Sequence, residues 1–497
     1  MGKRKTLYLP KQMSTEQRAY EASSSGRRLG AWDAPALSPR KASTTELDLI
    51  RKRSRAGIRN NPWLSRAIKV IVANEVGTGI IPRPNTPDKK LNAELLELWR
   101  DFAPTADANG MLTVYAIQAQ AVRACRESGE AFIRIIRTRP SRSQPVPLQF
   151  QLLEADYCPL SLNVQRSDAN DIVNGVEVNS AGKAVAYWLY KSHPDDGYSF
   201  SMNDLERVPV ENMIHHFIPD RPGQLRGVPA GTQSMVRAYV FDKYDDAELG
   251  RKEARANFTG VIRRPDYGSQ DYKFDPISGE PITKDGSDVP MIDMETGTFP
   301  SLLPGEDITL FDGDDAGRGY SEYQRWQLLA LSAGYDTPYQ LISGDYNNIN
   351  DRVWRAIMNQ FHLEIEQNQD LFTIPQLCRR MWIEFVDRAI LSGAIDAPSD
   401  FAVKRLQYIR AEHRAPAFKH IHPVQDVQAK VLEVENAFKS RQRVVDELRG
   451  EPVEEVDRQR KEDADREKKH GLNQQVIGQE SSDDKPEDKQ QDKKQGK

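Results

Sequence analysis

The chain has 497 residues, of which 38% are hydrophobic and 29% are charged, and its mean hydropathy of −0.67 is polar. It contains no run of about 18 apolar residues, which excludes a transmembrane helix. Cys125, Cys158 and Cys378 are too few and too scattered for a disulfide framework or a zinc cluster, which favours a reducing compartment. The length predicts about three domains.

The charge is distributed unevenly along the chain. Residues 1–60 carry a net charge of +9, residues 451–497 carry −3, and the middle of the chain therefore carries −10 of the total of −4. A basic arm on an acidic body indicates a polyanionic or acidic partner for the arm. A protein that coats DNA would be basic throughout, so that class is excluded.

The first half of the chain predicts a mixture of helices and strands. Residues 1–45 show little periodicity and are predicted to be a flexible arm. Helical spacing covers 45–60, resumes after Asn61-Pro62 and stops at Gly77-Thr78-Gly79. Two helices and then four strands are predicted at 88–101, 113–128, Ala131–Arg137, Leu148–Leu153, Gly175–Val178 and Ala184–Tyr190.

The longest uninterrupted helix is predicted from Ala230 to Phe258, where Val236, Val240 and Tyr244 are spaced by four and Gly260 follows. Residues 263–319 carry 13 acidic and 5 basic side chains with repeated Gly, Pro and Asp. That segment is too long for a plain connection, so it is either a small inserted domain or a functional loop. A helix at 320–333 follows it.

The last third of the chain is predicted to be mainly helical. A polar loop from Gly334 to Asn350 leads into a second long helix that Pro375 bends or restarts and Gly393 ends. Val424, Val427, Val431, Val434 and Phe438 form an amphipathic or coiled-coil-like seam. Ser440 is a predicted N-cap, and three short helices in series are expected before a disordered, charged tail.

No enzyme signature is present: the sequence contains no Walker A, GxSxG or HExxH motif. Asp312-Gly313-Asp314-Asp315 resembles the start of a calcium loop, but Ala316 takes the third ligand position and no glutamate follows at the twelfth. Gly77-Thr78-Gly79 is interpreted as a turn rather than a phosphate cradle. We therefore expect no catalytic residue, no metal and no cofactor.

The histidines and cysteines are interpreted as structural. His215 and His216 are neighbours in a predicted strand, so they point to opposite faces and do not readily share a metal. His413, His420 and His422 lack matching carboxylates or thiols. Cys125 and Cys378 lie on apolar helical faces and are expected in the core.

Five strings occur in order along about residues 45–465. They are Arg59-Asn60-Asn61-Pro62 with Asn74–Ile80, His216 with Gly223–Pro229, Leu303–Glu306, Pro338–Asn350 with Arg355-Ala356, and Pro423–Ala429 with Ser440 and Gly450. Together they resemble the lambda-type family of phage portal proteins. Two positions depart from that family: Asp351-Arg352-Val353 stands where Tyr-Ser-Ser is common, and His422 stands where Asp is common.

The resemblance implies an α+β portal fold assembled as a ring, typically of twelve copies, and assigns the parts of the chain. These are a basic arm (1–45), a mixed α/β wing (46–229), a first stem helix (230–260), a small α/β clip (261–319), a second stem helix (320–334), a channel loop (335–352), a long helix with a return to the wing (353–421), crown helices (422–460) and a tail (461–497).

The resemblance also implies the function and the partners. The ring is a conduit for double-stranded DNA at one capsid vertex, and it docks the terminase large subunit, head-completion or adaptor proteins, and major capsid and scaffold proteins. The resemblance implies that the protein has no membrane partner. It also implies that the protein is located in the host cytoplasm during assembly and in the virion afterwards. Asn347, Asn348, Asn350 and Arg352 are expected to face DNA in the channel loop. The expected motor-facing clip residues are Asp285, Asp288, Asp293, Glu295, Asp312, Asp314 and Asp315.

Other interpretations stay open at this point. The alternative from a different class is a DNA-processing nuclease or metal-dependent hydrolase, which needs a carboxylate cluster that holds a metal. A third is a monomeric scaffold or adaptor. The three asparagines also suit ordinary turn chemistry. The basic arm is compatible with binding scaffold, capsid lining or DNA, with removal by a maturation protease, or with no role.

Overall fold

The computed structural model describes most of the chain between residues 35 and 471. The described residues are 35–44, 46–142, 144–166, 169–196, 204–257, 260–263, 307–310, 319–347, 349–418, 423–449 and 453–471. The predictions for 1–34, for most of the acidic segment and for the end of the tail lie outside them.

The first helices of the described chain include two that are joined by a capped turn. These first helices are α1 (Pro39–Thr44), α2 (Leu47–Asn60), α3 (Pro62–Glu75), α4 (Lys89–Phe102), η3 (Ala103–Thr105) and α5 (Val114–Ser128). Asn61 separates α2 from α3, and its side-chain oxygen accepts hydrogen bonds from the backbone N–H groups of Trp63 (3.0 Å) and Leu64 (3.2 Å). With Pro62 in the first turn, these bonds start a new helix and turn the chain.

Strands follow α5 and form two antiparallel sheets. They are β2 (Glu130–Arg137), β3 (Leu148–Leu153), β4 (Asp171–Val173), β5 (Val176–Val178), β6 (Ala184–Tyr190), β7 (Leu205–Pro209) and β8 (Met213–Phe217), with the 3-10 turns η4 (Ala155–Tyr157) and η6 (Val210–Asn212) between them. The strand orders are β3-β2-β8 and β4-β5-β6-β7. All four strands expected from the sequence are present.

The main core lies on one side of β2 and β3 and is closed by α4, α5 and the C-terminal half of the long helix. Trp99 packs edge-on against Trp382 and Phe385, with ring centroids 5.5 and 4.9 Å apart. Cys125 and Cys378 are buried as expected, as is Cys158, and none of the three forms a disulfide. A second apolar cluster joins α2 and α3 to the helices that contain Phe241, Leu331 and Ile342.

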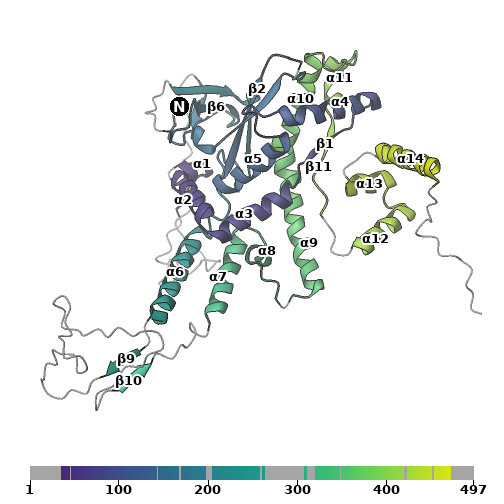
Figure 1. The fold of residues 1–497 in the computed structure, drawn as a ribbon. Coiled ribbons are helices and arrows are strands. Elements are labelled where there is room, and N and C mark those ends of the chain that lie inside the picture. Colours follow the sequence, from purple (N-terminus) through teal and green to yellow (C-terminus); the bar gives the residue numbers. More distant parts are fainter. Residues whose placement is uncertain are drawn as a thin grey trace, which may run out of the picture.

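Two helices run side by side away from this body in Figure 1. They are α6 (Met235–Asn257) and α7 (Tyr320–Gly334), and beyond them β9 (Gly260–Arg263) pairs antiparallel with β10 (Asp307–Leu310). The inner faces of the two helices meet through Ala238, Phe241, Leu328 and Leu331. The pair is therefore a projecting hairpin whose far end carries the acidic segment.

After α7 the chain returns to the body through the short helix α8 (Tyr339–Ser343) and then a long, continuous helix in three parts. The three parts are α9 (Asp351–Asn368), the π-helical stretch η7 (Gln369–Cys378) and α10 (Arg379–Leu391). Helix α11 (Phe401–Tyr408) and strand β11 (Ala411–Arg414) follow. Pro375 lies inside η7, so the expected bend is a wide π-helical stretch in a continuous helix. Strand β11 pairs with β1 (Ile81–Pro84), which ties this segment to the N-terminal part.

The C-terminal helices are α12 (Pro423–Glu435), α13 (Arg441–Arg449) and α14 (Val453–His470). Ser440 caps α13 as predicted, because its hydroxyl accepts a hydrogen bond from the N–H of Arg443 (3.2 Å). The predicted seam on α12 is not covered by the described part of the chain: Val424 is 70% exposed and Phe438, beyond the helix, 81%. None of the described helices is long and apolar enough to cross a membrane.

Three element boundaries differ from the sequence expectations. Residues 39–44 of the predicted arm are helical, and Leu37 accepts a hydrogen bond from Arg221 (3.1 Å). The first long helix begins at Met235 rather than Ala230, because Gly231 takes a positive φ with its Cα against the Tyr335 ring. Helix α14 continues to His470, past the predicted start of the tail at 461, and ion pairs one turn apart stabilise it.

Candidate functional site

The segment 335–352 joins the projecting hairpin to α9, and only its second half is an open loop. Tyr335 and Ile342 are buried in the cluster beneath α3, and Ile342 lies within the short helix α8. Gly344 ends α8 in the left-handed conformation. The expectation of a loop over the whole of 335–352 is therefore wrong for its first half, and the exposed part begins at Gly344.

The asparagines of this loop have assigned turn roles where the structure describes them. The N–H of Asn347 donates to the Asp345 carboxylate (3.1 Å), and the Asn350 side chain caps α9 by accepting from the N–H of Val353 (2.9 Å). Hydrogen bonds from Asn347 and from the Tyr339 hydroxyl lower the pKa of Asp345. Asn348 lies outside the described residues.

Arg352 follows this cap on the first turn of α9, and its side chain is exposed. Among the described residues it has no ion-pair partner. Its neighbour Arg355, in contrast, is paired with Asp351 one turn away. Asn347, Asn350 and Arg352 thus lie within one short stretch of the chain, and all three are exposed.

Polar contacts fix the two helices of the projecting hairpin against each other. The Tyr320 hydroxyl donates to Asp245 (3.0 Å) near the far end, and Arg237 donates to Gln327 (2.9 Å) near the body. Burial and the Asp245 carboxylate raise the pKa of Tyr320 to about 12. Val236 and Val240 of the predicted stripe on α6 are exposed, whereas the Tyr244 ring packs against Tyr323 of α7, with centroids 4.6 Å apart. Ala238 and Phe241 also face α7.

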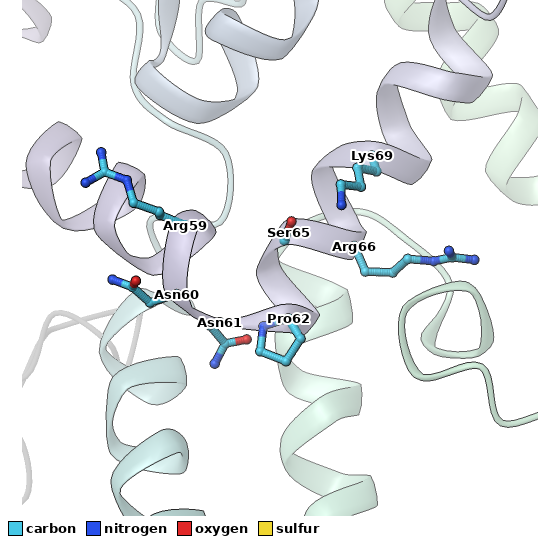
Figure 2. Close-up of a pocket in the computed structure, with 7 residues that line it drawn as sticks. All are labelled: Arg59, Asn60, Asn61, Pro62, Ser65, Arg66 and Lys69. Carbon is cyan, nitrogen blue, oxygen red and sulfur yellow. The ribbon is translucent and has the colours of Figure 1, made fainter.

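A basic hollow of about 410 Å³ lies where α2 meets α3, above the start of the projecting hairpin (Figure 2). It is lined by Arg59, Asn60, Asn61, Pro62, Ser65, Arg66 and Lys69. The Arg66 guanidinium donates to the carbonyl of Leu341 in α8 (3.1 Å), which links the hollow to the segment 335–352. In the sequence, Arg59–Pro62 contributed only to the resemblance to the family, and no basic hollow was predicted there. The spacing of the basic residues Arg59, Arg66 and Lys69 is the pattern that could have predicted it.

Glu130 is the centre of a buried ionic cluster. Its carboxylate is fully buried and accepts from Arg226 (2.8 Å from Nε), from His215 (2.8 Å) and from the N–H of Gly227 (3.1 Å), and it is paired with Arg51. Burial acts to raise the pKa of Glu130, but the two guanidinium groups and His215 outweigh it and lower the pKa well below its usual range. The string containing Arg226-Gly227 therefore has a structural role.

Glu75 is the centre of a second cluster, which ties η7 to α3 and α5. Arg126 donates to its carboxylate (2.7 Å), and so does the Thr373 hydroxyl (2.6 Å), while the Gln369 side chain donates to the Glu75 carbonyl (2.7 Å). Within the string Asn74–Ile80, Glu75 is thus a buried residue that ties three helices together.

The two adjacent histidines have separate partners, as their alternating directions predicted. His215 contacts Glu130, and His216 contacts the Gln376 side chain (3.0 Å) on η7. Burial lowers the pKa of His216 to about 4. The glycine turn is also confirmed: Gly77 and Gly79 both take positive φ, and the Tyr115 ring occupies the space where Gly79 lacks a side chain.

One group in the described part of the chain has the composition of a cation site: Glu154, Asp156 and His193. Arg55 already pairs with both carboxylates, at 3.4 Å from Glu154, so a cationic side chain balances their charge. The predicted clip acids, which are Asp285, Asp288, Asp293, Glu295, Asp312, Asp314 and Asp315, lie outside the described residues, as do His420 and His422.

The fold is that of a protein with a mixed α/β body and a projecting helical hairpin. The family model described as "Phage portal protein, lambda family" matches residues 25–369 of the 497. The chain belongs to the lambda family of phage portal proteins. This family is a structural capsid component, so the expectation that the chain is not an enzyme is confirmed, and the nuclease alternative is set aside.

Individual relatives agree with this assignment. The chain is 22% identical over 486 residues to the portal protein of Escherichia phage N15, covering 90% of both chains. It is 21% identical over 416 residues to portal protein B of Escherichia phage lambda, covering 75% of each, and 22% identical over 365 residues to a probable portal protein of Halomonas phage phiHAP-1, covering 71% of this chain and 68% of that one.

Solved structures with a similar fold come from gene transfer agent particles. A chain from the neck of a native particle computed with C12 symmetry is 17% identical, with a TM-score of 0.42 over 84% of this chain and 96% of that one. A chain from the virion of a native particle is 16% identical, with a TM-score of 0.44 over 82% and 94%. At these scores they add nothing to the family assignment.

Proposed function

We propose that copies of this chain form a closed ring, expected to contain twelve subunits, through which double-stranded DNA enters and leaves a phage capsid. The observation that carries the proposal is membership of the portal family over residues 25–369. The projecting hairpin supports it, because α6 and α7 expose apolar side chains that the described residues of the chain leave uncovered. The ring would occupy the virion vertex after assembly in the host cytoplasm.

In this proposal each part of the subunit has a place. Residues 46–229, with the returning segment, form the outer wing, and α6 with α7 forms the stem. The acidic segment at the far end of the stem forms the clip, which would meet the terminase large subunit during packaging and head-completion or adaptor proteins afterwards. Helices α12–α14 form the crown inside the capsid, near capsid and scaffold proteins.

The electrostatics of the chain suit a conduit. Each contact between a cationic side chain and a phosphate adds salt-dependent affinity, so a wall rich in such contacts would hold DNA in place. The middle of the chain carries a net charge of −10, and a ring multiplies it into an acidic tube. In the proposed channel loop, Asn347 and Asn350 are neutral and exposed, and Arg352 supplies one positive charge per subunit.

Two experiments test the proposal. Electron cryomicroscopy of the purified protein is expected to show a ring with residues 344–352 in the lumen, and a lumen without that segment would contradict the channel assignment. In a phage that carries the variant, Asn347→Arg is expected to slow DNA packaging while rings still form, and Asn347→Ala is the neutral control. Packaging at the normal velocity in Asn347→Arg would contradict the role of the loop.

A further inference from the structure

The projecting hairpin has two apolar faces that no described residue of the same chain covers. On the side of α6 away from α7, Val236 is 71% exposed, Tyr239 60% and Val240 55%. On the side of α7 away from α6, Trp326 is 66% exposed. Large apolar side chains gathered on one face of a helix generally mark an interaction surface.

Each face is a stripe at helical spacing. The α6 outer stripe consists of Val236, Tyr239, Val240 and Lys243, at positions i, i+3, i+4 and i+7. The α7 outer stripe consists of Glu322, Trp326 and Leu329, at positions i, i+4 and i+7. The inner contacts of the hairpin, through Ala238, Phe241, Leu328 and Leu331, place these two stripes on opposite sides of the pair.

Contacts inside the hairpin show which residues of the two stripes lie at the same level. Helices α6 and α7 are antiparallel, and Asp245 lies beside Tyr320 while Arg237 lies beside Gln327. Counting between these anchors places Lys243 level with Glu322. It likewise places Tyr239 level with residues 325–326 and Val240 level with residues 324–325.

In a ring whose rotation axis is parallel to the hairpin, neighbouring copies are related by rotation about that axis. This rotation does not change the height of a residue along the axis, which is what its level means here. The α6 outer stripe of one copy would therefore meet the α7 outer stripe of the next at matching levels, with Trp326 against Tyr239 and Val240. Such pairing of two different surfaces is heterologous, the type that closes into rings.

The charges at the ends of the stripes are complementary. Lys243 lies over the Tyr239 ring, 4.6 Å from its centroid, and has no carboxylate partner among the described residues. Glu322 is exposed and has no cationic partner there either. A rotation that preserves levels brings these opposite charges together, so the same register pairs apolar with apolar and cation with anion.

We propose that the α6 outer stripe of one copy packs against the α7 outer stripe of a second copy of this chain, with Trp326 inserted beside Val240 and Glu322 paired with Lys243. The proposal rests on the ring proposed above and adds to it which two faces meet, in which direction and at which register. Trp326 fits the role of a central anchor, since large aromatic side chains dominate interface energies.

Disulfide cross-linking tests the pairing. Lys243→Cys and Glu322→Cys replace two exposed side chains at one level of the proposed contact and leave Trp326 in place. The three native cysteines are buried, so background oxidation is not expected. After mild oxidation the double variant is expected to give a ladder of cross-linked oligomers. A mixture of the two single variants, co-expressed, is expected to give dimers, while each single variant alone gives none.

Two results would overturn this pairing. Rings of the double variant that do not cross-link would refute it and leave the proposed function intact. Dimers from either single variant alone would show a two-fold pairing instead. If the wild-type chain forms no ring, the proposed function itself fails, so the two failures are distinguishable.

A charge exchange tests the register independently. Lys243→Glu and Glu322→Lys, each alone, are expected to raise the subunit concentration needed for half-assembly about tenfold or more, and the double variant is expected to restore it. Lys183→Glu, at an exposed turn of the wing, is the matched control and is expected to assemble normally. Single variants that assemble like this control would contradict the pairing of Lys243 with Glu322.

Discussion

Replacing Glu130 tests whether the buried ionic cluster holds together the helices and strands around it. Glu130→Gln keeps the size of the side chain but removes its negative charge. Arg51 and Arg226 would then remain buried without the carboxylate that neutralises them, since both are almost fully inaccessible. Four chain segments meet at this carboxylate, because Arg51 comes from α2, Glu130 from β2, His215 from β8 and Arg226 from the segment before α6.

The expected loss of stability is large. Removing one partner of a buried ion pair costs about 3–5 kcal/mol, because the remaining charge stays in a poorly solvated place. Two guanidinium groups lose their carboxylate partner here, so the loss is expected in the upper part of that range. The hydrogen bonds from Arg226 to the carbonyls of Ala155 (3.2 Å) and Cys158 (3.0 Å) persist in the variant. A loss of this size is a substantial fraction of the ~5–15 kcal/mol that stabilises a typical domain.

Urea unfolding, followed by far-UV circular dichroism at a fixed protein concentration, measures the effect. The matched control is Glu94→Gln, which removes a carboxylate from an exposed pair with Lys90 at 3.4 Å. That change is expected to cost about 0–1 kcal/mol. A Glu130→Gln variant that loses no more stability than Glu94→Gln would refute the reasoning that this cluster stabilises the fold.

Three further predictions concern single side chains. Gly227→Ala is expected to unfold or severely destabilise the protein, because a Cβ would overlap the carbonyl of Gly129, whereas Gly250→Ala, with open space around it, should be neutral or up to ~1 kcal/mol stabilising; thermal melts compare them. Burial lowers the pKa of His216 to about 4, so as the pH falls the unfolded chain binds a proton at this histidine before the folded chain does. The free energy of unfolding should therefore fall between about pH 6.5 and 4, by up to ~1.4 kcal/mol per pH unit. His216→Gln should show a shallower loss of stability between pH 7 and 5, and an unchanged slope would count against this role of His216. Asn350→Ala removes the cap of α9 and should cost about 1 kcal/mol in urea unfolding, with no loss as the contrary result.

The sequence predicted the local elements well. Strands β2, β3 and β6 follow runs of β-branched and aromatic residues, and their predicted bounds match the structure within a residue. Asn61-Pro62 and Ser440 were readable as helix starts, because a cap depends only on residues within one turn. Asn350 was considered for the channel, and its capping role follows the same local chemistry.

Features that depend on distant parts of the chain were missed. The start of α6 at Met235 is set by the packing of Gly231 under Tyr335, about a hundred residues away in sequence. The Glu130 cluster joins residues that no spacing rule connects. The apolar periodicity of Val236, Val240 and Tyr244 was detected, but periodicity gives a face and not what covers it, and the described residues of the chain leave Val236 and Val240 exposed.

The most direct test of the account is the mass of the purified protein in solution, measured by mass photometry and checked by electron microscopy. The account predicts rings of many copies of the 56.4 kDa chain, with the paired α6 and α7 helices around a central channel. A single 56.4 kDa species at every concentration would contradict it.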